Sequence, residues 1–302
     1  MAKSTPLVST AEGSNQDAFR GADWMLLGIA GGVWGASFFF IAEALDSFQP
    51  MLITWLRVAL GFATLSCVPR AHSPIDRHDW PKVALIALVW MAFPLSMFPL
   101  AEQHVSSSVA GMLNGGTPIF AAIVATVLLR RPPGKRQRLG LIVGSLGIAL
   151  IGWPSLRQGS SSAIGVGLIL LALCSYGLAI NIVVPMQQKY GALPVLWRAA
   201  GIAALMLAPF GMAAVPASSF SWHSLFANVA LGVLGSAVAF VAAGTLAGRV
   251  GSTRAAMTTY VIPVVALFLG AAVRSEAIAL LSVLGCATVL FGAFLASRSE
   301  RN

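Results

Sequence analysis

Long apolar segments separated by short polar connections run through almost the whole chain. Ten such segments can be counted, at residues 24–42, 50–69, 80–100, 106–129, 138–153, 164–184, 194–214, 224–247, 255–273 and 278–296. Most approach or exceed the roughly 20 apolar residues that a helix needs to cross the hydrocarbon core of a bilayer. The pattern therefore predicts an all-α integral membrane protein with ten transmembrane helices, whose connections are too short to hold a folded extramembrane domain.

The fourth and ninth segments resemble each other and indicate an internal repeat. Residues 106–131 contain a helix-weakening cluster at 114–118, and a similar run extends over residues 252–274. Met112 matches Met257 and Pro118 matches Pro263, both 145 residues apart, and the same offset aligns Gly140 with Gly285 and Gly147 with Gly292, without a gap. We interpret this register as two five-helix repeats, residues 24–153 and 164–296.

Composition and charge agree with a membrane location. Charged residues make up 10% of the chain and hydrophobic residues 57%, whereas a soluble domain has about 25% charged residues. The tail before Asp23 is polar and lacks the apolar core of a cleaved signal peptide, so we expect the first segment to remain in the mature protein. The net charge of +9 does not indicate nucleic-acid binding, because its densest basic cluster, residues 130–138, lies in a short connection between two spans.

The distribution of lysine and arginine predicts the orientation. With a cytoplasmic N-terminus, the two tails and the even-numbered connections hold 15 of these residues, and the odd-numbered connections hold only Arg157 and Arg274. Since basic residues are retained on the cytoplasmic side, both tails, 1–23 and 297–302, are expected inside. Five spans per repeat then give the two repeats opposite orientations, an arrangement that places a substrate site near the midplane in many carriers.

The chain resembles the drug/metabolite transporter superfamily, and within it the EamA-type exporters. The resemblance covers residues 24–296 and rests on an ordered, duplicated set of residues: Trp34-Gly35, Pro50 with Arg57, Thr117-Pro118, Gly140 and Gly147, then Tyr176-Gly177, Pro194 with Arg198, Ile262-Pro263, Glu276, Gly285 and Gly292. Arg131 departs from the family pattern, which often has a glutamate there, as Glu276 is in the second repeat. The resemblance implies export of small metabolites, often amino acids and in some members aromatic ones, across the bacterial inner membrane. It also implies a central cavity lined by spans one, three, four, six, eight and nine.

Aromatic and neutral polar residues in these spans are the candidate substrate contacts. They are Trp34, Phe38, Trp90, Phe93, Met97, Asn114, Thr117, Tyr176, Asn181, Ser236, Phe240, Thr259 and Tyr260. Such residues match the usual small-molecule site, an apolar cavity with a few placed polar groups, although aromatic side chains also pack between helices or face lipid. Pro94, Pro118 and Pro263 are candidate kinks or gating points. Arg57, deep in the second span, could bind a substrate carboxylate, or it could bond to carbonyls or reach the headgroups.

Cofactor chemistry and enzyme activity are not expected. Cys67, Cys174 and Cys286 lie far apart in apolar runs, without a CxxC spacing or a nearby histidine, and are expected to be buried packing residues. Histidines and carboxylates occur only in tails, connections or span ends, such as Glu43, Glu102 and Glu276, so facilitated transport is favoured. The alternatives are a proton-coupled antiporter, a nucleotide-sugar or lipid-carrier flippase, a channel-like protein and, least favoured, an intramembrane enzyme. The expected partners are a small-molecule substrate and the bilayer, without nucleic acid, metal or cofactor; a monomer and a homodimer are both left open.

Overall fold

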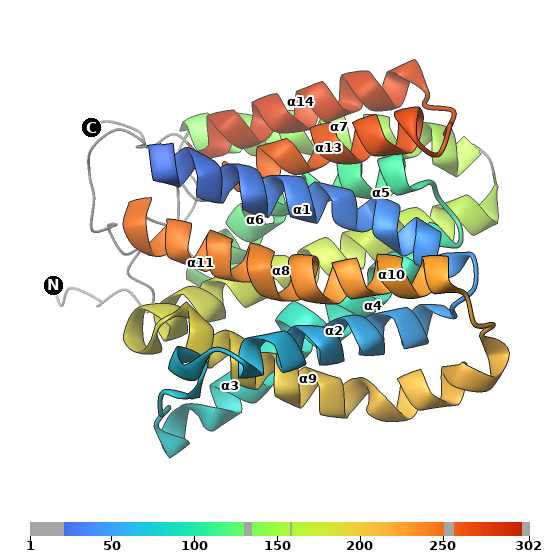
Figure 1. Cartoon of the computed structure of the whole chain (residues 1–302). Coiled ribbons are helices and arrows are strands. Elements are labelled where there is room, and N and C mark those ends of the chain that lie inside the picture. The colour runs from blue at the N-terminus through green and yellow to red at the C-terminus, as the bar shows by residue number, and fades with distance from the viewer. Residues whose placement is uncertain (1–20, 130–134, 158, 251–256, 298–302) are drawn as a thin grey trace, which may run out of the picture.

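The structure is a computed structural model that describes residues 21–129, 135–157, 159–250 and 257–297 (Figure 1). Within these ranges every regular element is helical. The predicted tails lie almost wholly outside the described residues, and so do Arg130 and Arg131 of the basic cluster. The fold class predicted from the apolar pattern, an all-α protein, is confirmed for the described part of the chain.

Each predicted apolar segment contains a helix. The first half of the chain contains α1 (Gly21–Leu45), α2 (Pro50–Ser66), η1 (Pro69–His72), η2 (Arg77–Asp79), α3 (Trp80–Ile86), η3 (Ala87–Ala92), α4 (Phe93–Glu102), α5 (Ser107–Asn114), α6 (Thr117–Leu129) and α7 (Lys135–Arg157). The second half contains α8 (Ser160–Tyr190), α9 (Ala192–Ala214), η4 (Val215–Ala217), α10 (Trp222–Ala230), η5 (Leu231–Val238), α11 (Ala239–Val250), α13 (Thr258–Ala272) and α14 (Leu280–Ser297).

Among the described residues, six continuous helical runs are long and apolar enough to span a membrane: Gly21–Leu45, Arg77–Glu102, Lys135–Arg157, Ser162–Tyr190, Ala192–Ala217 and Trp222–Leu246. A seventh span is formed if α5 and α6, which are bent by 40° relative to each other, are counted together. Three further apolar helices, α2, α13 and α14, are shorter. The described helices therefore form a multi-pass membrane protein.

Several spans are interrupted near their middle. Gly115 and Gly116 form the turn between α5 and α6. The third and eighth segments each contain a π-helical stretch, η3 between α3 and α4 and η5 between α10 and α11. The π-helical residues 87–92 and 232–237 are 145 residues apart, the offset of the predicted repeat. The third and eighth segments thus share a π-helical stretch at equivalent positions, although only the third contains prolines. The sequence pattern did not indicate this similarity.

Helices of the first half pack mainly against helices of the second half, and the contacts are the same when the two halves are interchanged. In the second and fifth predicted segments, α2 packs against α9 and α7 packs against α14. The contact of α1 with α13 is matched by the contact of α8 with α6. Likewise α1 contacts α11 of the eighth span, and α8 contacts α4 of the third. Each of these contacts of a helix in one half therefore has an equivalent contact made by the corresponding helix of the other half.

The two ends of the bundle are named here by α1. We call the end at which α1 begins the near end, and the end at which α1 passes into α2 the far end (Figure 1). The last described helix, α14, finishes at the near end, because it runs antiparallel to α7 along a row of glycine contacts. The described chain therefore starts and finishes at the same end of the bundle.

Two of the three cysteines are not core residues. Cys67 and Cys174 are exposed on the surface of the bundle, and only Cys286 is buried. The expectation of buried packing positions is therefore wrong for Cys67 and Cys174, because an apolar run in a membrane protein has a lipid-facing side as well as a core-facing side.

Candidate functional site

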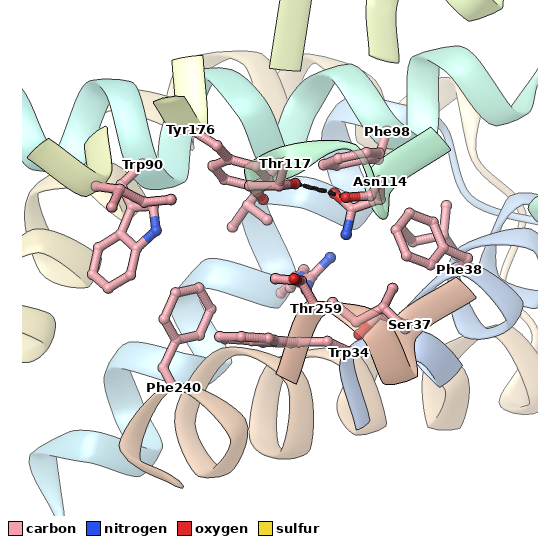
Figure 2. Close-up of a pocket in the computed structure, with 15 residues that line it drawn as sticks. Trp34, Ser37, Phe38, Trp90, Phe98, Asn114, Thr117, Tyr176, Phe240 and Thr259 are labelled. Atoms are coloured by element: carbon pink, nitrogen blue, oxygen red, sulfur yellow. Dashed lines mark hydrogen bonds between the residues drawn. The ribbon is translucent and has the colours of Figure 1, made fainter. Parts of the chain in front are cut away.

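A cavity of about 170 Å³ lies in the middle of the bundle. It is lined by Trp34, Ser37, Phe38 and Ile41 of α1, Arg57 of α2, Trp90 of η3, Leu95 and Phe98 of α4, Asn114 of α5, Thr117 of α6, Tyr176 and Ile180 of α8, Phe240 of α11, and Thr259 and Ile262 of α13. Figure 2 shows these side chains converging from helices of both halves. Such a cavity, apolar with a few polar groups, is the usual form of a small-molecule site.

Aromatic side chains line the cavity at both of its ends. Toward the near end, Phe240 contacts Trp34 edge to face with ring centroids 5.1 Å apart, and Trp90 at 4.9 Å. Toward the far end, Phe38 contacts Phe98 edge to face at 5.4 Å (Figure 2). These edge-to-face geometries are the favourable ones for aromatic pairs. The cavity is thus lined at both ends by paired aromatic rings.

Neutral polar groups form the wall at the break between α5 and α6. The Thr117 hydroxyl donates to the Asn114 carbonyl oxygen at 2.7 Å and lies 3.4 Å from the Asn114 side-chain oxygen (Figure 2). The broken helix therefore presents an amide and a hydroxyl to the cavity. On the other side, the Trp34 indole N–H donates to the Gly235 carbonyl at 3.1 Å, within η5. The π-helical stretch thus supplies the acceptor that fixes this indole.

Arg57 supplies the charge of the cavity. Its side chain is 4% exposed, and Nε donates to the Ser236 hydroxyl at 3.0 Å. Across the described ranges, no carboxylate forms an ion pair with it. The second span was expected to be peripheral, and in this chain it reaches the cavity through Arg57. Arg57 leaves most of its guanidinium donors for another acceptor.

Nine of the residues predicted from the sequence line this cavity: Trp34, Phe38, Arg57, Trp90, Asn114, Thr117, Tyr176, Phe240 and Thr259. Phe93 is 38% exposed, and Met97 packs against the hydrophobic core. An ideal α-helix would have put both on the face of Trp90, but the i→i+5 geometry of η3 moves that face to Leu95 and Phe98. The predicted roles of Phe93 and Met97 are therefore not supported by their positions.

Three further predicted residues also lie beside the cavity instead of lining it. Asn181 donates its amide to the Gly177 carbonyl, one turn earlier in α8, at 2.8 Å. Ser236 is buried beneath Arg57, and Tyr260 packs against the core next to Thr259. The lining residues that the prediction omitted, Ser37, Ile41, Leu95, Phe98, Ile180 and Ile262, are mostly apolar. Their composition alone does not distinguish them from core residues; only the fold does.

The predicted proline positions differ in their effect. Pro94 lies within the continuous helical run Arg77–Glu102, just after η3, and the Val89 carbonyl five residues before it accepts a hydrogen bond from the Ser175 hydroxyl at 2.6 Å. Pro118 stands in the first turn of α6, after the turn at Gly115-Gly116, where the missing N–H needs no partner. The bend of the fourth span is consequently at Gly115-Gly116. Pro263 lies within α13, which continues past it. The role of these prolines in gating stays a prediction.

Polar networks join the helices at the far end. The Glu276 carboxylate accepts four hydrogen bonds from the first turn of α5, from the backbone N–H and hydroxyl of Ser107 and of Ser108, at 2.5–3.1 Å. Burial alone would raise the pKa of Glu276, but these hydrogen bonds hold it below its ordinary value. Beside this cap, Arg274 pairs with Glu43, which also contacts His223.

The near end has its own ion pairs. Arg249 of α11 pairs with Asp23 of α1 at 2.6 Å. Lys189, at the end of α8, contacts Asp76 at 2.9 Å and Asp79 at 2.8 Å. Both ends of the bundle are therefore held by contacts between spans in this conformation.

Comparison with known proteins identifies the family to which the chain belongs. The profile of the EamA-like transporter family matches residues 23–153 and, a second time, residues 163–298. The chain belongs to the EamA-like transporter family. Each match covers one half of the chain, and the family name identifies the bundle as a membrane transporter.

Individual relatives agree with the family. The chain is 22% identical over 277 residues to an uncharacterized transporter of Archaeoglobus fulgidus, covering 92% of this chain and 99% of that one. It is 27% identical over 275 residues to the uncharacterized inner membrane transporter YedA of Escherichia coli K12, covering 87% and 86%. It is 24% identical over 276 residues to a probable terminal-alkyne amino-acid exporter of Streptantibioticus cattleyicolor, covering 88% and 90%. A solved crystal structure with 17% identity shares the fold, with a TM-score of 0.60 over 92% of this chain and 97% of that one.

Proposed function

We propose that this EamA-like transporter exports small zwitterionic metabolites, in particular neutral or aromatic amino acids, across the bacterial inner membrane by alternating access. The observation that carries the proposal is Arg57, a buried guanidinium without a carboxylate partner among the described residues, in a cavity that is otherwise neutral. A charge inside a membrane protein is costly unless it is paired. A substrate carboxylate would provide that partner, through a bidentate pair of hydrogen bonds.

The rest of the lining suits the other parts of an amino acid. Trp34, Trp90, Phe98 and Phe240 offer apolar surface for a side chain. Aromatic faces and the Asn114 side-chain oxygen suit an ammonium group. The amino-acid exporter among the relatives supports the same substrate class.

The transport cycle follows from two inverted five-span repeats. Three observations support this arrangement: the exchange of the two halves in the helix contacts, the two profile matches, and the π-helical stretches 145 residues apart. With ten spans, the charge distribution puts both tails in the cytoplasm and the far end outside. Rocking of one repeat against the other would then open the cavity to each side in turn.

We further propose that the substrate gradient drives transport. The described cavity wall contains no aspartate, glutamate or histidine that could carry a proton through the cycle. The same wall has a single cation, whereas the phosphates of a nucleotide sugar or lipid carrier would favour several. A proton-coupled antiporter would accumulate substrate against its gradient when a pH gradient is imposed, and this chain is expected not to.

The experiment is counter-flow of phenylalanine in proteoliposomes. Unlabelled phenylalanine, or phenethylamine, which lacks the carboxylate, would be added as a competitor of the labelled phenylalanine. The assay would be run with the wild-type protein, with Arg57→Gln and with Arg57→Lys. Arg198→Gln is the matched control, because Arg198 is partly buried, bonds to the Ala71 and Pro194 carbonyls and lies outside the cavity.

We expect phenylalanine to compete well with the wild-type protein and phenethylamine to compete poorly. Arg57→Gln should weaken phenylalanine binding about 10- to 100-fold, the value of a hydrogen-bonded charge pair of roughly 1.5–3 kcal/mol, and should abolish the preference over phenethylamine. Arg57→Lys should keep part of the preference for phenylalanine over phenethylamine, and Arg198→Gln should keep all of it. An unchanged preference in folded Arg57→Gln protein would refute the carboxylate role.

A further inference from the structure

Glu102 is an acid whose buried carboxyl oxygens have no hydrogen-bond partner among the described residues. It is the last residue of α4, at the far end of the third span. The residue as a whole is half-buried, but both of its carboxyl oxygens are buried. No hydrogen-bond donor of the described residues reaches either oxygen. This contrasts with Glu276 nearby, whose two oxygens accept four hydrogen bonds.

The charges around Glu102 do not compensate it. Glu276, Arg274 and Arg57 lie within its electrostatic range. Glu276 is itself an anion held by the serines of α5, and Arg274 is already paired with Glu43. Arg57 is directed at the cavity and bonds to Ser236. The titratable and charged groups on the surrounding elements, in the middle and at the far end of the bundle, are Glu43, Arg57, Cys174, Tyr176, Arg274, Glu276 and the adjacent His104. Asp23 of α1 and Lys189 of α8 form ion pairs at the near end.

An ionised carboxylate in such a place is strongly destabilised, whereas a protonated one is neutral. We propose that Glu102 is a proton-binding site, and that the far end of the transporter closes only when Glu102 has taken up a proton. When the far end opens, water reaches the carboxyl group and the proton leaves. The proposal rests on the orientation given under the proposed function, in which the far end faces the exterior.

The position of Glu102 determines what this proton can do. Phe98 lies one turn earlier on the same face of α4, and its ring packs against Phe38 at 5.4 Å (Figure 2). Both rings line the cavity, and Phe98 lies one turn of α4 nearer the middle of the bundle than Glu102. Under the proposed orientation, Glu102 exchanges its proton with the exterior side only. The proton controls the rate of transport without being carried across, which is compatible with transport driven by the substrate gradient.

The expected pH dependence has a definite sign. Because closing takes up one proton, a lower exterior pH favours the closed far end, by up to tenfold per pH unit. Export should consequently slow as the exterior becomes acidic. A neutral residue at position 102 should give the slow, acid-like rate at every pH.

The first test needs no substrate. Infrared spectra of the full-length protein at pH 7 should show the carbonyl stretch of a protonated carboxylic acid, and Glu102→Gln should lose it. Glu276→Gln is the control and should keep it, because the Glu276 carboxylate is hydrogen-bonded as an anion. Absence of the band from the wild-type protein, or its persistence in Glu102→Gln, would overturn the proposal. Glu102→Leu is a second neutral variant, and failure of both neutral variants to fold would also overturn it.

The second test measures phenylalanine efflux from proteoliposomes while only the exterior pH is varied. The wild-type rate should fall toward acid pH, and Glu102→Gln should give a flat profile. His223→Gln is the control, because His223 is another titratable group at the far end, in contact with Glu43. It should keep the wild-type pH profile if Glu102 is the responsible group. A wild-type profile in Glu102→Gln would contradict the proposal, and so would loss of substrate binding at every pH, which would instead indicate a contact with the substrate ammonium group. If no variant transports phenylalanine, the proposed substrate fails and the infrared result still decides the fate of Glu102.

Discussion

At the scale of single residues, Asn114 and Thr117 show how the chain places polar groups at membrane depth. The Thr117 hydroxyl bonds to the Asn114 carbonyl, so the backbone at the turn between α5 and α6 keeps a partner. The Asn114 side chain is only 8% exposed and belongs to the cavity wall. The break is therefore stabilised by the threonine, and the amide remains available to a ligand.

This division of roles makes Asn114→Leu informative. We expect the variant to fold and to reach the membrane, because Thr117 still bonds to the backbone, but to lose at least about tenfold in flux, the value of one hydrogen bond to a charged group. Counter-flow in proteoliposomes measures it. Asn181→Leu is the matched control, since the Asn181 amide bonds to its own helix and lies outside the cavity wall. Equal flux in both variants would remove Asn114 from the site.

At the scale of helices, Glu276 acts as a cap supplied from a distant part of the chain. It lies in the connection between α13 and α14 and bonds to the first turn of α5, where backbone N–H groups have no partner within the helix. Ser275, just before it, has a φ of 54°, a left-handed conformation that is unusual for a residue other than glycine. The connection is thus shaped so that the carboxylate meets Ser107 and Ser108.

The cap predicts a loss of stability in acid. Because the folded protein lowers the pKa of Glu276 from its ordinary value of 4.5, its contribution is complete above pH 4.5 and is lost as the pH falls through the folded value. Glu276→Gln should reduce the free energy of unfolding at pH 7 by about 0.5–2 kcal/mol and should flatten this acid limb. Thermal unfolding in detergent between pH 7 and pH 3 measures both effects.

Asp46→Asn is the control for that experiment, since Asp46 is an exposed far-end carboxylate whose nearest cation, Arg274, is 3.7 Å away. It should unfold like the wild-type protein. If Glu276→Gln kept the wild-type acid limb, the cap would have no part in stability.

At the scale of the whole molecule, the contact between α7 and α14 joins the two halves along glycines. A Cβ atom added to Gly147 would lie 2.5 Å from the Val289 backbone nitrogen and 2.8 Å from the Gly285 carbonyl oxygen. Backbone atoms cannot move aside as the end of a side chain can. The two helices therefore approach so closely that only glycine fits there.

Gly147→Ala should accordingly destabilise the protein by about 1–3 kcal/mol, the usual cost of overpacking. Gly167→Ala is the matched control, because no atom lies within 4 Å of a Cβ added there, and the higher helix propensity of alanine should stabilise by up to about 1 kcal/mol. Thermal unfolding in detergent should show opposite signs for the two variants. Equal effects would contradict the close approach of α7 and α14.

The sequence by itself determined the helical class and the apolar segments, because hydrophobicity is a local property of the chain. The repeat that it predicts rests on the 145-residue offset between the two halves. The sequence also identified Trp34, Asn114 and Tyr176 as cavity candidates, because polar or aromatic side chains stand out within apolar helices. Only the tertiary structure placed Arg57 in the cavity wall and replaced Phe93 and Met97 by Leu95 and Phe98. It also left the Glu102 carboxyl group without a hydrogen-bond partner in the part of the chain that it describes. Those outcomes depend on π-helical turns and on contacts between residues more than 100 positions apart. A local hydrophobic pattern contains neither kind of information.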